Sequence, residues 1–569
     1  MGRSRSRKPR RIGVSRREFL KRAGVASASL GVLPLLPGCG GGGGGGPGDG
    51  VTAETLFQHS VASGDPLSDG VMLWTRLTQN GSGDVSADYV VATDPALKNV
   101  IVSGSTTTNA ARDYTVKVDV AGLAPATTYY YRFSAFGIDS PIGRTRTLPL
   151  GSLDRLRFGV VVCASLAHGY FNAYARVAER SDLDFVLHLG DYIYEYADGD
   201  YGKLRNYEPA NECITLTDYR TRHAQYKREP ELQAMHRQHP MIAIWDDHEF
   251  ANNAYKDGAE NHQPATEGDW HVRVAGALQA YYEWMPVRPT GPGNPIRNYR
   301  SFSFGDLVDL FLLEERVGAR DMQVKPNEIP VGNTGIGAFT ESGDFADASR
   351  QMLGSDEEQW LFGKLRTSTA KWKMLGQGVM FAQLKLLGLP NALGLSQYFN
   401  NDQWDGYAPA RQRIYDVLKG DANNAAVNNV VVMTGDIHTS WGADLTPDPN
   451  NPLVARGGYN KSSGEGSLAV EFVDTSVTSP GIDALVPLVD VVKANNPHFK
   501  YVDLSQKGYM LMDVTRDRVS GEWWYVDTVT ARSPNQAFGT ALQVLDQTNH
   551  LVASTQSDPL PSPPAPAPG

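Results

Sequence analysis

Four apolar runs in this chain each end in side chains that can bind a metal ion, and this pattern narrows the folds open to it. Continuously apolar runs are typical of strands buried on both faces of a sheet. Helix-like segments lie between them, at 169–180, 216–236 and 274–284. Because ligands of such sheets gather where the strands end, the sequence predicts an α/β fold with a functional site at one sheet edge. The runs with their polar ends are 158–163, 185–191, 241–249 and 430–438.

The polar ends supply a thiol, several carboxylates, imidazoles and a phenol. Taken singly, each is equally well explained by a turn or a solvated loop, since a Gly-Asp pair often caps a helix. If they converge, so many anionic groups would be costly to bury without cations. We therefore favour a metal cluster over four unrelated loops. Asp191 is central in the set and is the natural bridging ligand.

The ligand types bear on which metals bind. Carboxylates suit calcium, magnesium or manganese, whereas a thiolate with a phenolate and an imidazole indicates iron, with zinc as the alternative. Cations that share a carboxylate can hold a phosphate, activate water and neutralise a leaving oxygen. The pattern thus predicts metal-dependent hydrolysis.

Residues 55–150 have the character of a small β domain. The segments 70–77 and 114–120 alternate with the period of half-buried strands. The segment 123–131 resembles the turn and tyrosine corner of a fibronectin-type sandwich. We expect a boundary near 147–152 and no chemistry in this domain.

Length and charge limit the function further. A chain of 569 residues is long enough for two domains. Its first 22 residues carry ten Lys or Arg and one Glu, so the formal charge of −10 leaves about −19 on the rest. That balance argues against nucleic-acid binding, which needs a basic surface.

The basic start is a targeting segment. Residues 15–21 resemble the twin-arginine export motif, and the apolar run 23–36 is too short to span a bilayer. Cys39 follows in a lipobox-like context before seven glycines, so we expect a signal peptide over 1–39 and a linker over 40–54. Ordinary cleavage nearby is the alternative to lipidation. At the other end, 546–569 is Pro-rich, and we expect disorder over 555–569.

Longer motifs carry a family resemblance. Gly190–Tyr196 reads GDYIYEY, and 245–249 reads WDDHE; 59–66, 73–76, 404–407 and 434–438 add further matches. Together they resemble the alkaline phosphatase D (PhoD) family of calcineurin-like metallophosphoesterases. The resemblance implies a β-sandwich metallophosphoesterase domain flanked by helices (αββα) over 151–545, after a fibronectin/Ig-like β-sandwich domain.

The resemblance also implies site residues. Iron as Fe(3+) would be held by Cys163, Asp191, Tyr194 and His438. Calcium would be held by Asp247 and Asp436, with Asp191 bridging the two kinds of metal; zinc, manganese, magnesium and cobalt are the alternatives. His248 would stabilise the transition state or the leaving group.

Several other residues are open candidates. Asn252 or Asn253 is a further potential ligand, and Arg316 and Arg320 match phosphate geometry, although surface arginines are common. His168 lies where many relatives have a different, shorter loop, so it faces the substrate or caps a surface helix.

The expected function is hydrolysis of phosphate esters by a metal-activated hydroxide in an exported, monomeric alkaline phosphatase or phosphodiesterase. A phospholipase D or teichoic-acid phosphodiesterase on the same fold is the alternative. A non-catalytic, metal-containing surface binding protein is the remote one.

Overall fold

The structure is a computed structural model, and it describes residues 51–79, 81–290, 293–324, 329–330 and 337–568. The predicted signal peptide, Cys39 and residues 40–50 of the linker lie outside the described residues. No described helix combines the length and the apolar character needed to cross a membrane.

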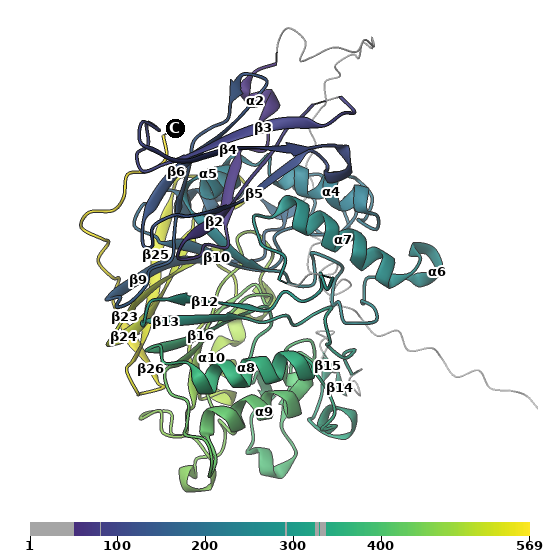
Figure 1. Ribbon diagram of the computed structural model, residues 1–569. Helices are drawn as coiled ribbons and strands as arrows, with labels where there is room; N and C mark the ends of the chain where they lie inside the picture. The colour runs from purple at the N-terminus through teal and green to yellow at the C-terminus, as the bar shows by residue number, and fades with distance from the viewer. Residues whose placement is uncertain (1–50, 80, 291–292, 325–328, 331–336, 569) are drawn as a thin grey trace, which may run out of the picture.

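Two large sheets dominate the molecule, as Figure 1 shows. The first runs in the order β26 (Leu551–Ser554), β25 (Gln536–Leu545), β24 (Arg518–Val526), β23 (Gly508–Thr515), β9 (Arg155–Val161), β10 (Phe185–Leu189), β11 (Pro240–Ile244), β1 (Val61–Gly64), β2 (Gly70–Arg76) and β5 (Thr115–Ala121). The second runs in the order β12 (Arg300–Phe304), β13 (Val308–Leu312), β16 (Trp372–Gln377), β19 (Val430–Thr434), β21 (Ala469–Val473), β20 (Ser440–Leu445) and β22 (Phe499–Asp503).

The central strands are buried on both faces, which explains their continuous apolar runs. Val160, Leu187 and Ile242 of the first sheet share one core with Leu310 and Val431 of the second. Their neighbours along the same strands, among them Val161, Val186 and Ala243, belong to a separate core beneath helices. The predicted α/β character is confirmed in this coarse form: the molecule has mixed sheets covered by helices and is largely β.

Helices cover the outer face of each sheet. The core outside the first sheet contains residues of α3 (Asn172–Ala178), α4 (Leu216–Tyr226), α5 (Pro230–Gln238) and α7 (Trp270–Trp284). The core outside the second contains residues of α8 (Ser355–Thr367) and α9 (Ala408–Lys419), with α10 (Val489–Asn495) packed at its margin. The remaining described α-helices, α2 (Ala53–Leu56) and α6 (Pro264–Glu267), are single turns. The helix expected over 216–236 is two helices, because Pro230 occupies the first turn of α5, where its missing N–H is tolerated.

The N-terminal strands do not form a detached unit. A small N-terminal sheet shares a core with β2 and β5. Its strands run in the order β4 (Val100–Thr108), β3 (Val85–Ala92), β6 (Thr128–Ala135) and β7 (Ile138–Asp139), and β8 (Gly143–Arg146) pairs with β6. Strand β1 pairs in parallel with β11, so β1, β2 and β5 continue the first large sheet. In the expected tyrosine corner, the Tyr129 hydroxyl accepts a hydrogen bond from the Ala124 N–H at 2.8 Å.

The predicted disorder of the C-terminal tail is wrong. In Figure 1 the yellow end of the chain follows the side of the molecule to the N-terminal strands. Arg155 and Arg157 donate to the Asp558 carbonyl, and the Tyr130 hydroxyl donates to the Ala565 carbonyl at 2.6 Å. Proline carries no N–H, but its backbone still offers carbonyl acceptors, and buried donors of the folded part satisfy them.

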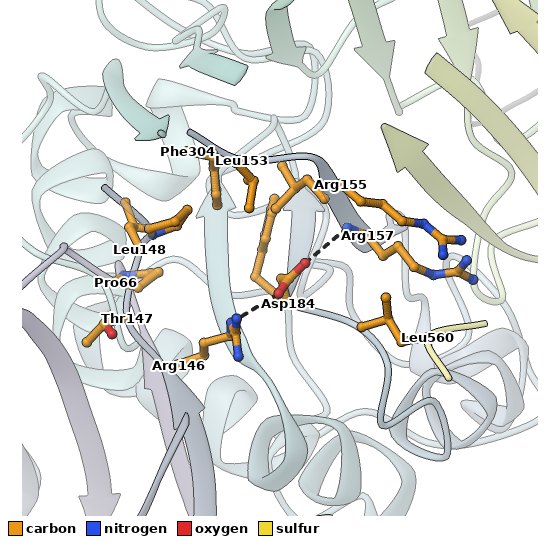
Figure 2. A pocket seen from close by; sticks show the side chains of 13 residues that line it. Pro66, Arg146, Thr147, Leu148, Leu153, Arg155, Arg157, Asp184, Phe304 and Leu560 are labelled. Atoms are coloured by element: carbon orange, nitrogen blue, oxygen red, sulfur yellow. Dashed lines mark hydrogen bonds and ion pairs between the residues drawn. The ribbon is translucent and has the colours of Figure 1, made fainter. Parts of the chain in front are cut away.

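A cavity of about 230 Å³ lies where the tail meets the domain boundary. Figure 2 shows Leu148, Leu153, Phe304 and Leu560 around it, with Asp184 between Arg146 and Arg157. Arg155 and Phe185 also line it, and both begin strands of the first sheet. The cavity is therefore at the opposite ends of these strands from Cys163 and Asp191.

Candidate metal centre

The predicted ligands follow strands that run in parallel, so their carboxyl ends meet at one edge. Strands β9, β10 and β11 are mutually parallel, and so are β13, β16 and β19. Gly190 allows the turn after β10, because it has φ 99° and a Cβ there would lie 2.4 Å from the Cβ of Asp246. Only glycine permits this turn and this close approach.

The backbone at the ligands is unusual. Positive φ values occur at Cys163 (56°), Asp191 (55°), Asp436 (55°) and His438 (61°). Such conformations cost on the order of 1–3 kcal/mol each in non-glycine residues and cluster at functional sites. Four of the six predicted ligands therefore sit on backbone that a sequence selected for stability alone would avoid.

The structure brings the predicted residues together in three groups. Each group has potential ligand atoms within 4.8 Å of one another, and every member is buried. Asp191 is the one residue common to all three, as expected for a bridging ligand. The groups are Cys163 with Asp191 and His438; Asp191 with Asp247 and His248; and Asp191 with Asp246, Asp247 and Asp436.

Tyr194 joins the first group through its hydroxyl. That oxygen lies 2.8 Å from Asp191 Oδ2 and 3.1 Å from His438 Nε2, and it accepts a hydrogen bond from Ser479 Oγ at 2.6 Å. His438 Nδ1 donates to the Pro480 carbonyl at 3.0 Å, which leaves Nε2 as the nitrogen that can bind a metal. The thiol, carboxylate, phenol and imidazole predicted from the strand ends are thus in one place.

The crowded acids perturb one another. Burial, then repulsion from Asp247 and Asp436, raises the pKa of Asp191 to about 7. Burial raises the pKa values of the Cys163 thiol and the Tyr194 phenol well above their usual range, and Asp191 adds to both shifts. A cation would reverse these directions by favouring the ionised forms, so the donor set fits bound metal.

His248 is held by a residue that the sequence did not single out. Its Nδ1 lies 2.7 Å from Glu195 Oε2, and both side chains are buried. Although burial opposes protonation, the charges of Asp247, Asp191 and Glu195 raise the pKa of His248 to about 10. The His248 ring also stacks on Tyr194 at 4.2 Å between centroids. The signal was present in the glutamate of GDYIYEY.

We expect Glu195→Gln to lower kcat by about tenfold to a hundredfold. The amide cannot raise the pKa of His248 as the carboxylate does, so the alkaline limb of the pH profile should move to lower pH. Steady-state kinetics across pH will measure both effects, with Glu208→Gln as a surface control. An unchanged alkaline limb would contradict the assigned pairing.

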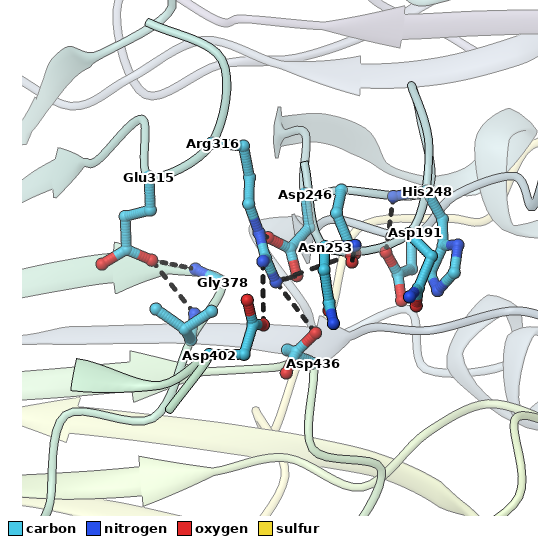
Figure 3. A network of polar contacts seen from close by, with 12 residues as sticks. Asp191, Asp246, His248, Asn253, Glu315, Arg316, Gly378, Asp402 and Asp436 are labelled. Atoms are coloured by element: carbon cyan, nitrogen blue, oxygen red, sulfur yellow. Dashed lines mark hydrogen bonds and ion pairs between the residues drawn. The ribbon is translucent and has the colours of Figure 1, made fainter. Parts of the chain in front are cut away.

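The arginines considered for phosphate are already engaged. Figure 3 shows the Arg316 guanidinium among Asp246, Asp402 and Asp436. Its Nη2 lies 3.0 Å from Asp246 Oδ2 and 2.9 Å from Asp436 Oδ1, and its Nη1 lies 2.9 Å from Asp402 Oδ2. Arg320 donates to Asp402 and to the Tyr407 hydroxyl. Both arginines therefore serve as counter-ions to buried carboxylates.

The asparagines adjoin the centre through their backbones. The N–H of Asn253 donates to Asp247 Oδ2 at 2.6 Å, and that of Asn252 donates to Glu195 Oε1 at 2.8 Å. Neither side-chain carbonyl oxygen has a hydrogen-bond partner among the described residues. His168 Nδ1 lies 2.8 Å from Ser165 Oγ, and its ring packs against Tyr201.

Comparisons with known proteins agree with this geometry. The family model described as PhoD-like phosphatase matches residues 158–523, and the model of that family's N-terminal domain matches 47–149. Alkaline phosphatase D of Bacillus subtilis (strain 168) is 35% identical over 521 residues, which cover 88% of this chain and 83% of that protein. A solved structure described as PhoD matches with a TM-score of 0.78 and 33% identity, covering 89% of this chain and 94% of the other. The chain therefore belongs to the PhoD-like phosphatase family and is a phosphoric ester hydrolase.

Proposed function

We propose that this protein is an exported, metal-dependent alkaline phosphatase or phosphodiesterase that releases phosphate from organic esters. The observation that carries the proposal is the position of Asp191, whose carboxylate belongs to three adjoining groups of buried ligands. A single carboxylate shared in this way is what a multi-metal phosphoesterase requires.

The ligand chemistry supports two kinds of metal. We assign Fe(3+) to Cys163, Asp191, Tyr194 and His438, because a thiolate, a phenolate and an imidazole together make a softer, more redox-compatible donor set than carboxylates alone. We assign Ca(2+) to Asp191, Asp247 and Asp436, with the free Asn253 side-chain oxygen as a further ligand. Zinc, manganese, magnesium and cobalt are the alternatives.

Bound cations supply charge neutralisation and water activation in such sites. The protein itself supplies orientation and a proton. With Nδ1 paired to Glu195, His248 keeps Nε2–H for the departing oxygen of the ester. The Arg316 counter-ion holds Asp436 in place through its 2.9 Å contact. Burial of all these groups excludes bulk water and strengthens each interaction.

The finer architecture and location belong to the same proposal. We propose the strands of the two packed sheets that lie within 151–545 as the metallophosphoesterase sandwich, and the strands of 55–150 as a fibronectin/Ig-like domain, three of which extend the first sheet. Export by the twin-arginine route, a periplasmic or surface location, a lipid on Cys39 and a monomeric state are proposed from the sequence.

Two rivals make different predictions. A phospholipase D or teichoic-acid phosphodiesterase would prefer diesters, so rates on matched monoester and diester substrates separate it from a phosphatase. A non-catalytic surface binding protein would hydrolyse neither when loaded with metal.

Elemental analysis with a visible spectrum tests the metal assignment. Protein purified after native export should contain iron at about one per chain and show a phenolate-to-iron absorption band. Tyr194→Phe should lose that band, whereas Tyr196→Phe, which removes a neighbouring phenol, should keep it. Colourless, zinc-only protein that Tyr194→Phe leaves fully active would overturn the iron site.

A further inference from the structure

Lys507 places a positive charge beside the metal centre. It lies in the loop between β22 and β23, and its Nζ donates to the His438 carbonyl at 3.2 Å. Its pKa is lowered to about 8 by burial, which outweighs the nearby charges of Asp483, Asp503 and Cys163, and no ion pair joins it to a carboxylate within the described part of the chain. An ammonium has three donors, so two of them remain for other acceptors.

Other cations near the centre differ in this respect. Arg316 and Arg320 are neutralised by carboxylates. The buried Arg222 guanidinium is satisfied by backbone carbonyls, including those of Tyr194 and Tyr196. Of these four cations, Lys507 alone combines the lack of an ion pair with spare donors, although Asp483 and Asp503 partly offset its charge.

The surroundings of Lys507 connect it to the reacting side of the site. Burial and the charge of Lys507 together lower the pKa of His168 to about 4, so the two side chains are electrostatic neighbours. The His168 ring packs on Tyr201 at 4.5 Å, Tyr201 stacks on Tyr194 at 5.4 Å, and Tyr194 stacks on His248. An aromatic wall thus runs from His248 toward Lys507.

A glycine makes room for the ammonium. A Cβ at position 481 would lie 2.3 Å from the Leu504 carbonyl oxygen and 3.0 Å from Lys507 Nζ, so a side chain there would crowd both the loop backbone and the ammonium. Gly481 follows Pro480, whose carbonyl orients His438. The segment that positions a proposed metal ligand therefore also admits the lysine.

We propose that Lys507 binds an anionic oxygen of the phosphate ester on the Cys163 and His438 side of the centre. This inference rests on the proposed phosphoesterase function and deepens it. A monoester carries one more negative charge than a diester, so an ammonium that binds the ester oxygen favours monoesters. Lys507 thereby sets the substrate class.

The neutral variant Lys507→Met tests the proposal, and Lys507→Arg is the variant that keeps the charge. Lys371→Met is the control, because it removes a lysine that pairs with Asp546. Losing a charged hydrogen bond should raise KM for a monoester by about tenfold to a hundredfold, with a smaller effect on a diester. Isothermal calorimetry of inorganic phosphate on metal-loaded protein should show a matching rise in Kd. Lys507→Arg should restore part of both, and metal content should equal wild type.

These outcomes distinguish a failure of the role of Lys507 from a failure of the proposed phosphoesterase function. If Lys507→Met raises KM equally for the monoester and the diester, or leaves the Kd for phosphate unchanged, the proposed role of Lys507 is wrong even in an active enzyme. If wild-type protein hydrolyses neither ester, the proposed function fails, while the phosphate Kd still decides whether Lys507 binds the anion. If Lys507→Met does not fold, Lys507→Gln takes its place as the neutral variant, and a phosphate Kd equal to that of wild type would overturn the proposal.

Discussion

Asp191→Asn should reduce kcat by at least about a thousandfold and remove both kinds of metal. Asp191 belongs to all three ligand groups, so its loss weakens every proposed metal site at once. An asparagine offers one neutral oxygen in place of two charged ones and cannot bridge two cations with the same strength. A thousandfold change corresponds to about 4 kcal/mol of lost transition-state stabilisation. Steady-state kinetics and elemental analysis measure the two effects together.

Asp184→Asn is the matched control for that experiment. Asp184 is the residue before β10, whereas Asp191 follows the same strand. The Asp184 carboxylate lies 3.1 Å from the Arg146 guanidinium and accepts a hydrogen bond from the Arg157 N–H at 3.0 Å. Its replacement should lower stability without changing metal content. If Asp191→Asn retains a full complement of iron and calcium, the bridging role is wrong.

Arg316→Met should destabilise metal-free protein by about 3–5 kcal/mol, because removing one partner of a buried ion cluster leaves uncompensated charge. Asp246 and Asp436 lose their ion pairs with Arg316, and Asp402 keeps only Arg320. Added calcium should restore part of the lost stability, because a cation bound to Asp436 relieves the repulsion between its carboxylate and the neighbouring carboxylates. Denaturant unfolding with chelator and with added calcium will measure the difference.

Arg320→Met provides the comparison for Arg316→Met. Arg320 pairs with Asp402 and donates to the Tyr407 hydroxyl, neither of which is a proposed calcium ligand, so its loss should not be rescued by calcium. Equal calcium responses in the two variants would contradict the assignment of Arg316 as a counter-ion to the metal-binding carboxylates.

The strands and their terminal ligands could be predicted because both signals are local. A run such as 185–191 shows burial on two faces, and the polar residue at its end follows directly in sequence. Parallel pairing then brings Cys163 and Asp191 to one edge of the first sheet, and Asp436, which follows β19 of the second sheet, reaches them because the two sheets pack together.

The missed features depend on partners distant in the chain. The Glu195 contact with His248 spans 53 residues, and the bond from Lys507 to His438 spans 69. Nothing near Arg316 indicates whether it will meet phosphate or carboxylate. The Pro-rich tail was misjudged for the same reason, since its carbonyls are satisfied by Arg155, Arg157 and Tyr130 far earlier in the chain.

The pairing of β1 with β11 has a consequence for self-association. Without the N-terminal strands, β11 would be an outer strand, and the backbone at Pro240 and Met241, which pairs with Ser63 and Gly64, would be uncovered at the start of the apolar segment PMIAI. Such an edge recruits other chains and promotes aggregation. With β1, β2 and β5 in place, the sheet ends instead at β5, which carries Lys117 and Asp119. The N-terminal region therefore covers the start of an apolar strand edge to which another copy of the chain could otherwise add.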